Sequence, residues 1–303
     1  MKAAIYFNEL QPLLYGYYIC KGVIFLHRKI SAAVFTVLTA MFMCGCTSDK
    51  NTVGQSAGHN DRGGVTPAET AFLTDGKEKV CYGQGYETDS DNRPVGAIQA
   101  QEKYGSYGGR FIFGKDDKTI HLTFDEGYEN GCTGKILDIL KEKKVTATFY
   151  VTLDYVKSSP ELVQRMINEG HEVGNHSCTH PSLPDISDDM VFEEIHGLET
   201  YISDNFGGYK TVTMRPPRGE FSVRTLRIAK NMGYDTVLWS FAYNDWNTDA
   251  QPDRDTAYRR ITSATHNGAV YLLHAVSETN TAILPDVIDY WLDNGYTVKS
   301  ISG

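Results

Sequence analysis

Short apolar runs alternate with amphipathic segments from about residue 118 to the end of the chain. Short runs rich in β-branched and aromatic side chains predict strands, and longer segments with apolar residues three and four apart predict helices. The predicted strands are 119–124, 145–151, 171–174, a strand ending at Met214, 236–241, 269–273 and 296–301. The predicted helices are 134–143, 160–169, 188–206, 222–232, 256–265 and 284–294. Such β-α alternation predicts an α/β fold with a parallel sheet, closed as a barrel or open.

An apolar run over residues 30–45 follows the basic residues Arg28 and Lys29. Its 16 residues are fewer than the roughly 20 of a transmembrane helix, so residues 1–46 are interpreted as an export signal. Gly45 and Cys46 resemble a bacterial lipobox, which predicts a lipoprotein; simple secretion, an uncleaved anchor and, least favoured, a buried core helix are the alternatives. Because residues 1–27 are long and aromatic for a signal's first part, translation from a later start is a further hypothesis.

The segment between this signal and the alternating region has two parts. Residues 47–66 consist mostly of Ser, Gly, Asn, Asp and Thr and predict a flexible linker. Residues 67–111 carry scattered aromatic residues among many glycines, so we expect an irregular N-terminal extension packed on the domain at 112–303.

Composition and charge exclude several classes of protein. Of 303 residues, 41% are hydrophobic, which is typical of a folded globular chain. The formal net charge of −9 argues against a partner bound through nucleic-acid phosphates. Six cysteines without a CxxC spacing indicate neither a disulfide framework nor a zinc ribbon.

Candidate catalytic residues follow the predicted strands, and the carboxyl ends of barrel strands are where catalytic residues gather. Asp125 and Glu126 close the first strand and precede Gly127. Neighbouring side chains on a strand point to opposite faces, so both acids can enter one site only where the strand breaks into a turn. A helix cap in a solvated turn is the alternative interpretation of this pair.

Two histidines four residues apart, His176 and His180, follow a later strand. This spacing allows both imidazoles to reach one metal ion, although such a pair is more often structural unless a carboxylate lies nearby. Cys178 between them is interpreted as a buried spacer.

Three further strand ends carry polar residues. In Arg215-Pro-Pro-Arg218-Gly the prolines fix a loop on which an arginine can hold a carboxylate, although a solvated arginine is the commoner case. Asp245 and Trp246 follow the next strand, and His274 closes the strand after that. A histidine at such a position is usually a core residue, but an acid on the neighbouring strand makes it a candidate general acid.

Together, in this order, these motifs resemble the polysaccharide deacetylase family, also called carbohydrate esterase family 4 or the NodB-homology domain. The resemblance covers roughly residues 112–303. Within the family, the runs 123–131, 241–246 and 272–277 look most like the delta-lactam-biosynthetic de-N-acetylases, which deacetylate N-acetylmuramic acid in peptidoglycan. The resemblance implies a distorted (β/α) barrel and metal-assisted amide hydrolysis.

The resemblance also implies a role for each site residue. Asp125 would be the general base and His274 the general acid, positioned by Arg215 and Asp245 respectively. The remaining assignments are His176, His180 and Glu126 as ligands of a divalent metal, with zinc expected, the backbone N–H of Arg218 at the oxyanion, Leu272 at the acetyl methyl, and Trp246 packed beneath the site.

The chain departs from the family at Glu126, where most members have aspartate as the third metal ligand. The longer side chain can still ligate or can turn away and leave a two-histidine site. Ala242 replaces another aspartate that many relatives have. We therefore expect an exported, monomeric cell-envelope hydrolase that acts on peptidoglycan strands and touches the membrane only through its N-terminus. An N-acetylglucosamine or chitin-type deacetylase, an O-acetyl esterase and a non-catalytic glycan-binding protein are the alternatives.

Overall fold

A computed structural model describes residues 76–303, and all structural statements below refer to this range. Its strands are β1 (Val80–Cys81), β2 (Gly109–Arg110), β3 (Thr119–Glu126), β4 (Thr148–Val151), β5 (Glu172–Asn175), β6 (Thr213–Met214), β7 (Glu220–Phe221), β8 (Asp235–Val237), β9 (Ala269–His274) and β10 (Thr297–Lys299). Its α-helices are α2 (Val95–Tyr104), α3 (Thr133–Lys143), α4 (Leu153–Ser158), α5 (Pro160–Asn168), α6 (Asp188–Asn205), α7 (Val223–Asn231), α8 (Arg254–Ser263) and α9 (Glu278–Asp293).

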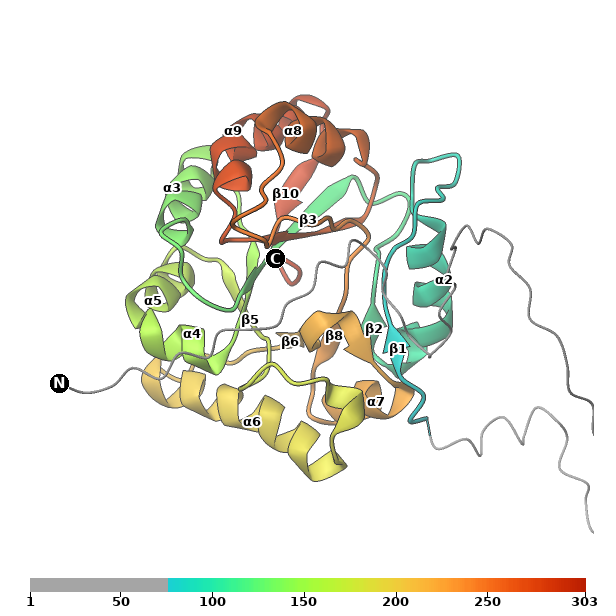
Figure 1. Cartoon of the computed structure of the whole chain (residues 1–303), viewed down its shortest axis with the longest axis vertical. Coiled ribbons are helices and arrows are strands. Elements are labelled where there is room, and N and C mark those ends of the chain that lie inside the picture. Colours follow the sequence, from blue (N-terminus) through green and yellow to red (C-terminus); the bar gives the residue numbers. More distant parts are fainter. Residues whose placement is uncertain (1–75) are drawn as a thin grey trace, which may run out of the picture. The chain divides into compact units, whose positions relative to one another are not determined.

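The main sheet is parallel and curled (Figure 1). Its strands follow the order β3-β4-β5-β6-β8-β2, and both β9 and β10 pair with β3. After β8 the chain crosses to β9, where the N–H of Ser240 donates to the carbonyl of Val270 and Phe241 bridges to Tyr271. The expected α/β fold of the distorted-barrel type is confirmed in this curled, half-barrel form.

β3 shows how the sequence builds this fold, because all eight of its residues are buried. Ile120, Leu122 and Phe124 belong to the main hydrophobic cluster, together with residues of α3 and α9. The alternate positions carry polar residues, among them Thr123 and Asp125. Helices cover one face of the strand, and the polar residues therefore lie on the concave face.

Two predicted elements differ clearly from the structure, and one helix of the alternating region was not predicted. The helix predicted from Leu284 begins at Glu278, where the Ser277 hydroxyl accepts a hydrogen bond from the N–H of Asn280, so Pro285 lies inside α9. The strand predicted over 236–241 ends at Val237, because the following residues cross to β9. A helix that the sequence did not predict, α4, begins at Leu153, after the N-cap Thr152, whose hydroxyl accepts a hydrogen bond from the N–H of Tyr155.

The part of the expected irregular extension that the structure describes contains a helix and a sheet strand. α2 contributes Ala97, Ala100 and Tyr104 to a second hydrophobic cluster, which also contains Phe111 and Phe221. β2 pairs with β8 in the main sheet. The predicted export signal, lipobox and linker lie outside the described residues. No described helix is both long and apolar enough to cross a membrane.

Candidate active site

β3 and β9 bring the predicted base and acid together. The two strands are paired in parallel, and Asp125 is the register partner of His274. His274 is the last residue of β9 and Asp125 the last but one of β3, so both lie at the carboxyl edge of the sheet. Register partners on neighbouring strands point to the same face, so a carboxylate and an imidazole share one side of the sheet.

Asp125 is held by a buried arginine. The Nη1 of Arg215 donates to Asp125 Oδ1 over 2.7 Å, and the other guanidinium nitrogens donate to the carbonyls of Val237 and Leu238. Burial alone would raise the pKa of Asp125, but the charges of Arg215, His176 and His274 outweigh it and lower that pKa. The Asp125 carboxylate therefore stays ionised at neutral pH and can accept a proton.

His274 is held by a buried carboxylate. Its Nδ1 lies 2.7 Å from Asp245 Oδ1, and its backbone N–H donates to Asp245 Oδ2 over 2.9 Å. Burial would lower the pKa of His274, but the hydrogen bond to Asp245 and the charges of Asp245 and Asp125 raise it above its usual value. His274 therefore keeps its second proton to a higher pH than an ordinary histidine, and in that form Nδ1–H is directed to Asp245 and Nε2–H is left for transfer.

Two residues that the sequence did not single out hold Asp245, and a third, Tyr243, holds one of them. The Nδ2 of Asn280 donates to Asp245 Oδ2 over 2.5 Å, and the Tyr243 hydroxyl bonds to Asn280 Oδ1. The Nε2 of Gln251 donates to the carbonyl of Asp245 over 2.7 Å. Asn280 lies in the first turn of α9, which the sequence placed outside that helix, so no pattern connected it to the site.

His176 and His180 lie beside Asp125. The Nδ1–H of His176 donates to the carbonyl of Arg215 over 2.8 Å, and its Nε2 lies 3.6 Å from Asp125 Oδ2. The centres of the two imidazole rings are 4.9 Å apart. Burial lowers the pKa of His176, and burial followed by the charge of His176 lowers the pKa of His180 to about 4. Both imidazoles are therefore neutral at pH 7, which is the form that binds metal ions.

Glu126 is not brought to this pair. β3 continues through Glu126, so its side chain lies on the face opposite Asp125, where its Oε2 accepts a hydrogen bond of 3.4 Å from the Thr133 hydroxyl. Its Oε1 is buried without a partner. Burial, followed by the charge of Glu129, raises the pKa of Glu126 well above its usual value. These contacts give no support to Glu126 as a metal ligand.

The family implies a bound divalent metal, and with Glu126 turned away the two histidines are the residues left to hold it. Among the described residues, no group of three His, Cys, Asp or Glu side chains is arranged to hold a metal ion. A neutral imidazole pair with a carboxylate nearby fits the donor chemistry of zinc. The residues present fit a two-imidazole site, and a set of three protein ligands that includes Glu126 does not fit.

The predicted substrate-binding residues differ in exposure. Leu272 is buried, and Arg218 is exposed with a φ of 61° between two buried residues. Trp246 is 56% exposed, so more than half of its surface is open to solvent, and its role at the site stays a prediction. It follows Asp245, whose side chain is fully buried.

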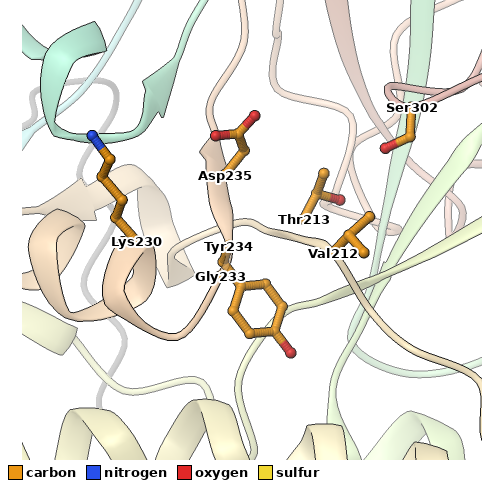
Figure 2. A pocket seen from close by; sticks show the side chains of 7 residues that line it. All are labelled: Val212, Thr213, Lys230, Gly233, Tyr234, Asp235 and Ser302. Atoms are coloured by element: carbon orange, nitrogen blue, oxygen red, sulfur yellow. The ribbon is translucent and has the colours of Figure 1, made fainter.

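The pocket in Figure 2 is separate from these residues. It has a volume of about 380 Å³ and lies at the starts of β6 and β8, which is the opposite end of the sheet from Asp125. Its lining residues are Val212, Thr213, Lys230, Gly233, Tyr234, Asp235 and Ser302. None of the predicted site residues lines it.

Comparisons with known proteins identify the family of this chain. A family model described as "Polysaccharide deacetylase" matches residues 114–237. The peptidoglycan-N-acetylmuramic acid deacetylase PdaA of Bacillus subtilis is 43% identical over 200 residues, which cover 66% of this chain and 75% of PdaA. The chain belongs to the polysaccharide deacetylase family.

Solved structures give the same fold. The structure of Bacillus subtilis PdaA, a family 4 carbohydrate esterase, matches this deacetylase-family chain with a TM-score of 0.71 and 39% identity, and covers 75% of this chain and 96% of that one. A CE4 family pseudoenzyme from Bacillus anthracis matches with a TM-score of 0.60 and 27% identity, over 64% and 67% of the two chains. The family therefore contains relatives with and without native activity.

Proposed function

We propose that the chain is a metal-dependent hydrolase that removes N-acetyl groups from peptidoglycan amino sugars, with N-acetylmuramic acid as its substrate. The observation that carries this proposal is the pairing of Asp125 with His274. Their environments move the two pKa values in opposite directions, so one group is a base and the other an acid at the same pH. Amide hydrolysis needs both, because water must lose a proton and the leaving nitrogen must gain one.

The chain's own residues account for the proton transfers. Asp125 accepts a proton from the attacking water as its oxygen adds to the acetyl carbon. The backbone N–H of Arg218 donates a hydrogen bond to the oxyanion that forms. His274 then gives its Nε2 proton to the nitrogen while the C–N bond breaks, which releases acetate and a free amine. Arg215 and Asp245 keep the base and the acid in place.

His176 and His180 would hold the divalent metal, for which zinc is proposed. When bound, such an ion polarises the acetyl carbonyl and lowers the pKa of water. Leu272 would contact the acetyl methyl. Trp246, which is exposed next to Asp245, would contact sugar at the rim of the site.

The substrate and location rest on the relatives. The similarity to PdaA, whose name gives N-acetylmuramic acid as its substrate, favours muramic acid over glucosamine in peptidoglycan. An enzyme with this substrate acts at the cell envelope. We therefore propose an exported, monomeric protein held at the membrane by a lipidated N-terminus, as the lipobox-like sequence at Cys46 predicts.

Mass spectrometry of peptidoglycan fragments tests the proposal. Fragments with and without stem peptides are incubated with the full-length protein and zinc. The expected result is loss of one acetyl group from the muramic residue, and the same protein with Asp125→Asn or His274→Ala should bind glycan but leave the mass unchanged. Loss of acetyl from glucosamine instead would move the assignment to an N-acetylglucosamine or chitin-type deacetylase.

A non-catalytic glycan-binding protein is the second candidate. The position of Glu126 away from the histidines favours it, and a pseudoenzyme relative shares the fold. Glycan binding without turnover of any N-acetyl or O-acetyl glycan, with and without metal, would support this candidate and contradict the deacetylase.

A further inference from the structure

A short N-terminal segment touches two loops of the candidate active site. The N–H of Tyr82 donates to the carbonyl of Gly219 over 3.1 Å, in continuation of the pairing between β1 and β7. The Tyr82 hydroxyl donates to the carbonyl of Trp239 over 2.6 Å. This segment precedes residues 114–237, which the family model matches, and the family motifs therefore do not include it.

Gln84 makes the most specific of these contacts. Its Oε1 accepts a hydrogen bond of 2.9 Å from Trp239 Nε1, and its Nε2 donates to the carbonyl of Ala242 over 2.9 Å. One carboxamide thus joins an indole to the chain that leads to Asp245. Replacing either half of the amide removes one of the two bonds, because the donor and the acceptor are both used.

Trp239 in turn lies against Arg215, the arginine that holds Asp125. The Arg215 guanidinium carbon is 5.9 Å from the centre of the Trp239 ring and 4.3 Å from the centre of the Tyr150 ring. Both distances are within the range of cation–π attraction. Gly219 leaves space for the indole, since a Cβ there would lie 2.6 Å from the Trp239 ring. The indole is therefore fixed by Gln84 at its nitrogen and by close packing at its ring.

We infer that Gln84 is a positioning residue for the site, acting through Trp239 on Arg215 and through Ala242 on the loop that carries Asp245. It touches neither substrate nor the reacting atoms. Its effect is on geometry: when the indole and the 242–245 loop are free to shift, Asp125 and His274 lose the alignment that hydrolysis needs. The expected loss of kcat rests on the proposed deacetylase function. The expected shift of the Trp239 indole rests on the contacts alone.

Gln84→Met in the full-length protein tests the inference, with Gln101→Met as the matched control. Gln101 also uses both halves of its amide, donating to the carbonyl of Gly109 and accepting from the N–H of Phe111, but contacts neither Trp239 nor Ala242. We expect Gln84→Met to lower kcat about tenfold or more with KM within about twofold, because misplacement of catalytic groups by an ångström is costly. Gln101→Met should stay within about twofold of wild type in both constants.

Fluorine NMR of protein labelled with 5-fluorotryptophan gives a readout that does not depend on turnover. The chain has three tryptophans, so Trp239→Phe assigns the Trp239 signal by its disappearance. We expect this signal to shift in Gln84→Met and to stay in place in Gln101→Met. If Gln84→Met does not fold, Tyr82→Phe, which removes the bond to the Trp239 carbonyl, is judged by the same criteria.

The outcomes separate the inference from the proposed function. Equal losses of kcat in the two glutamine variants, or wild-type kcat in Gln84→Met, would overturn the inference. If the wild-type protein turns over no N-acetyl glycan, the proposed function fails, and the NMR comparison alone decides. A Trp239 signal that shifts in Gln84→Met but not in Gln101→Met supports the positioning role. An unmoved signal in Gln84→Met overturns it.

Discussion

Replacement of Glu126 by glutamine is predicted to remove a pH dependence of stability. Glu126 is fully buried, and this burial raises its pKa in the folded protein well above the ordinary value of 4.5. Above pH 4.5 the unfolded chain therefore releases this proton while the folded chain keeps it. The contribution of Glu126 to the free energy of unfolding is fully present at low pH. It falls by about 1 kcal/mol per pH unit as the pH rises towards the pKa of Glu126 in the folded protein.

Urea unfolding at pH 5, 6 and 7 measures this effect. The wild-type protein should lose about 1 kcal/mol more per pH unit than Glu126→Gln between pH 5 and pH 6. Glu102→Gln, at an exposed position on α2, should keep the wild-type slope. Equal slopes for the wild type and Glu126→Gln would refute the assignment of a buried, protonated acid. Zinc binding, measured by calorimetry, should be unchanged in Glu126→Gln, and its loss would restore Glu126 as a ligand.

Three further predictions concern the groups around the acid–base pair. Asp245→Asn should lower the pKa of His274, because the carboxylate charge that counteracts the effect of burial is removed. The alkaline limb of the pH–rate profile should then move to lower pH. An unmoved limb would contradict the role of His274 as the acid. Gly174→Ala should cost about 1–3 kcal/mol in urea unfolding, since its Cβ would lie 2.5 Å from two atoms of the Tyr150 ring. Arg215→Met, which leaves a buried carboxylate unpaired, should cost about 3–5 kcal/mol, and a wild-type unfolding midpoint would exclude that cost.

The sequence predicted the elements of the sheet well where local signals dominate. The helix expected at 160–169 is found at Pro160–Asn168, with its proline in the first turn. The helix predicted over 284–294 begins earlier, because Ser277 caps it and the residues before Pro285 pack on the core. α2 was missed because its packing partners, such as Phe221, are far away in the sequence.

The site residues were likewise predicted where a local sequence signal exists and missed where only contacts between distant parts of the sequence place them. Strand ends located Asp125 and His274, but only the register of β3 with β9 makes them neighbours. The face of Glu126 depended on whether β3 ends in a turn before it, and the strand continues through that residue. Asn280 and Gln84 support the site through contacts that span 35 and more than 150 residues, which no local pattern reports.

The backbone pairing of β3 with β9 also determines which parts of the site can adapt to a substrate. The base and the acid are on strands joined from Ile120–Ala269 to Asp125–His274, so thermal motion cannot separate them without opening that ladder. We therefore expect adjustment to glycans of different length in two largely exposed segments, residues 127–131 after β3 and residues 246–250 between Asp245 and α8. Variation in these two segments would change the choice of glycan while the distance between the two proton-transfer groups stays constant.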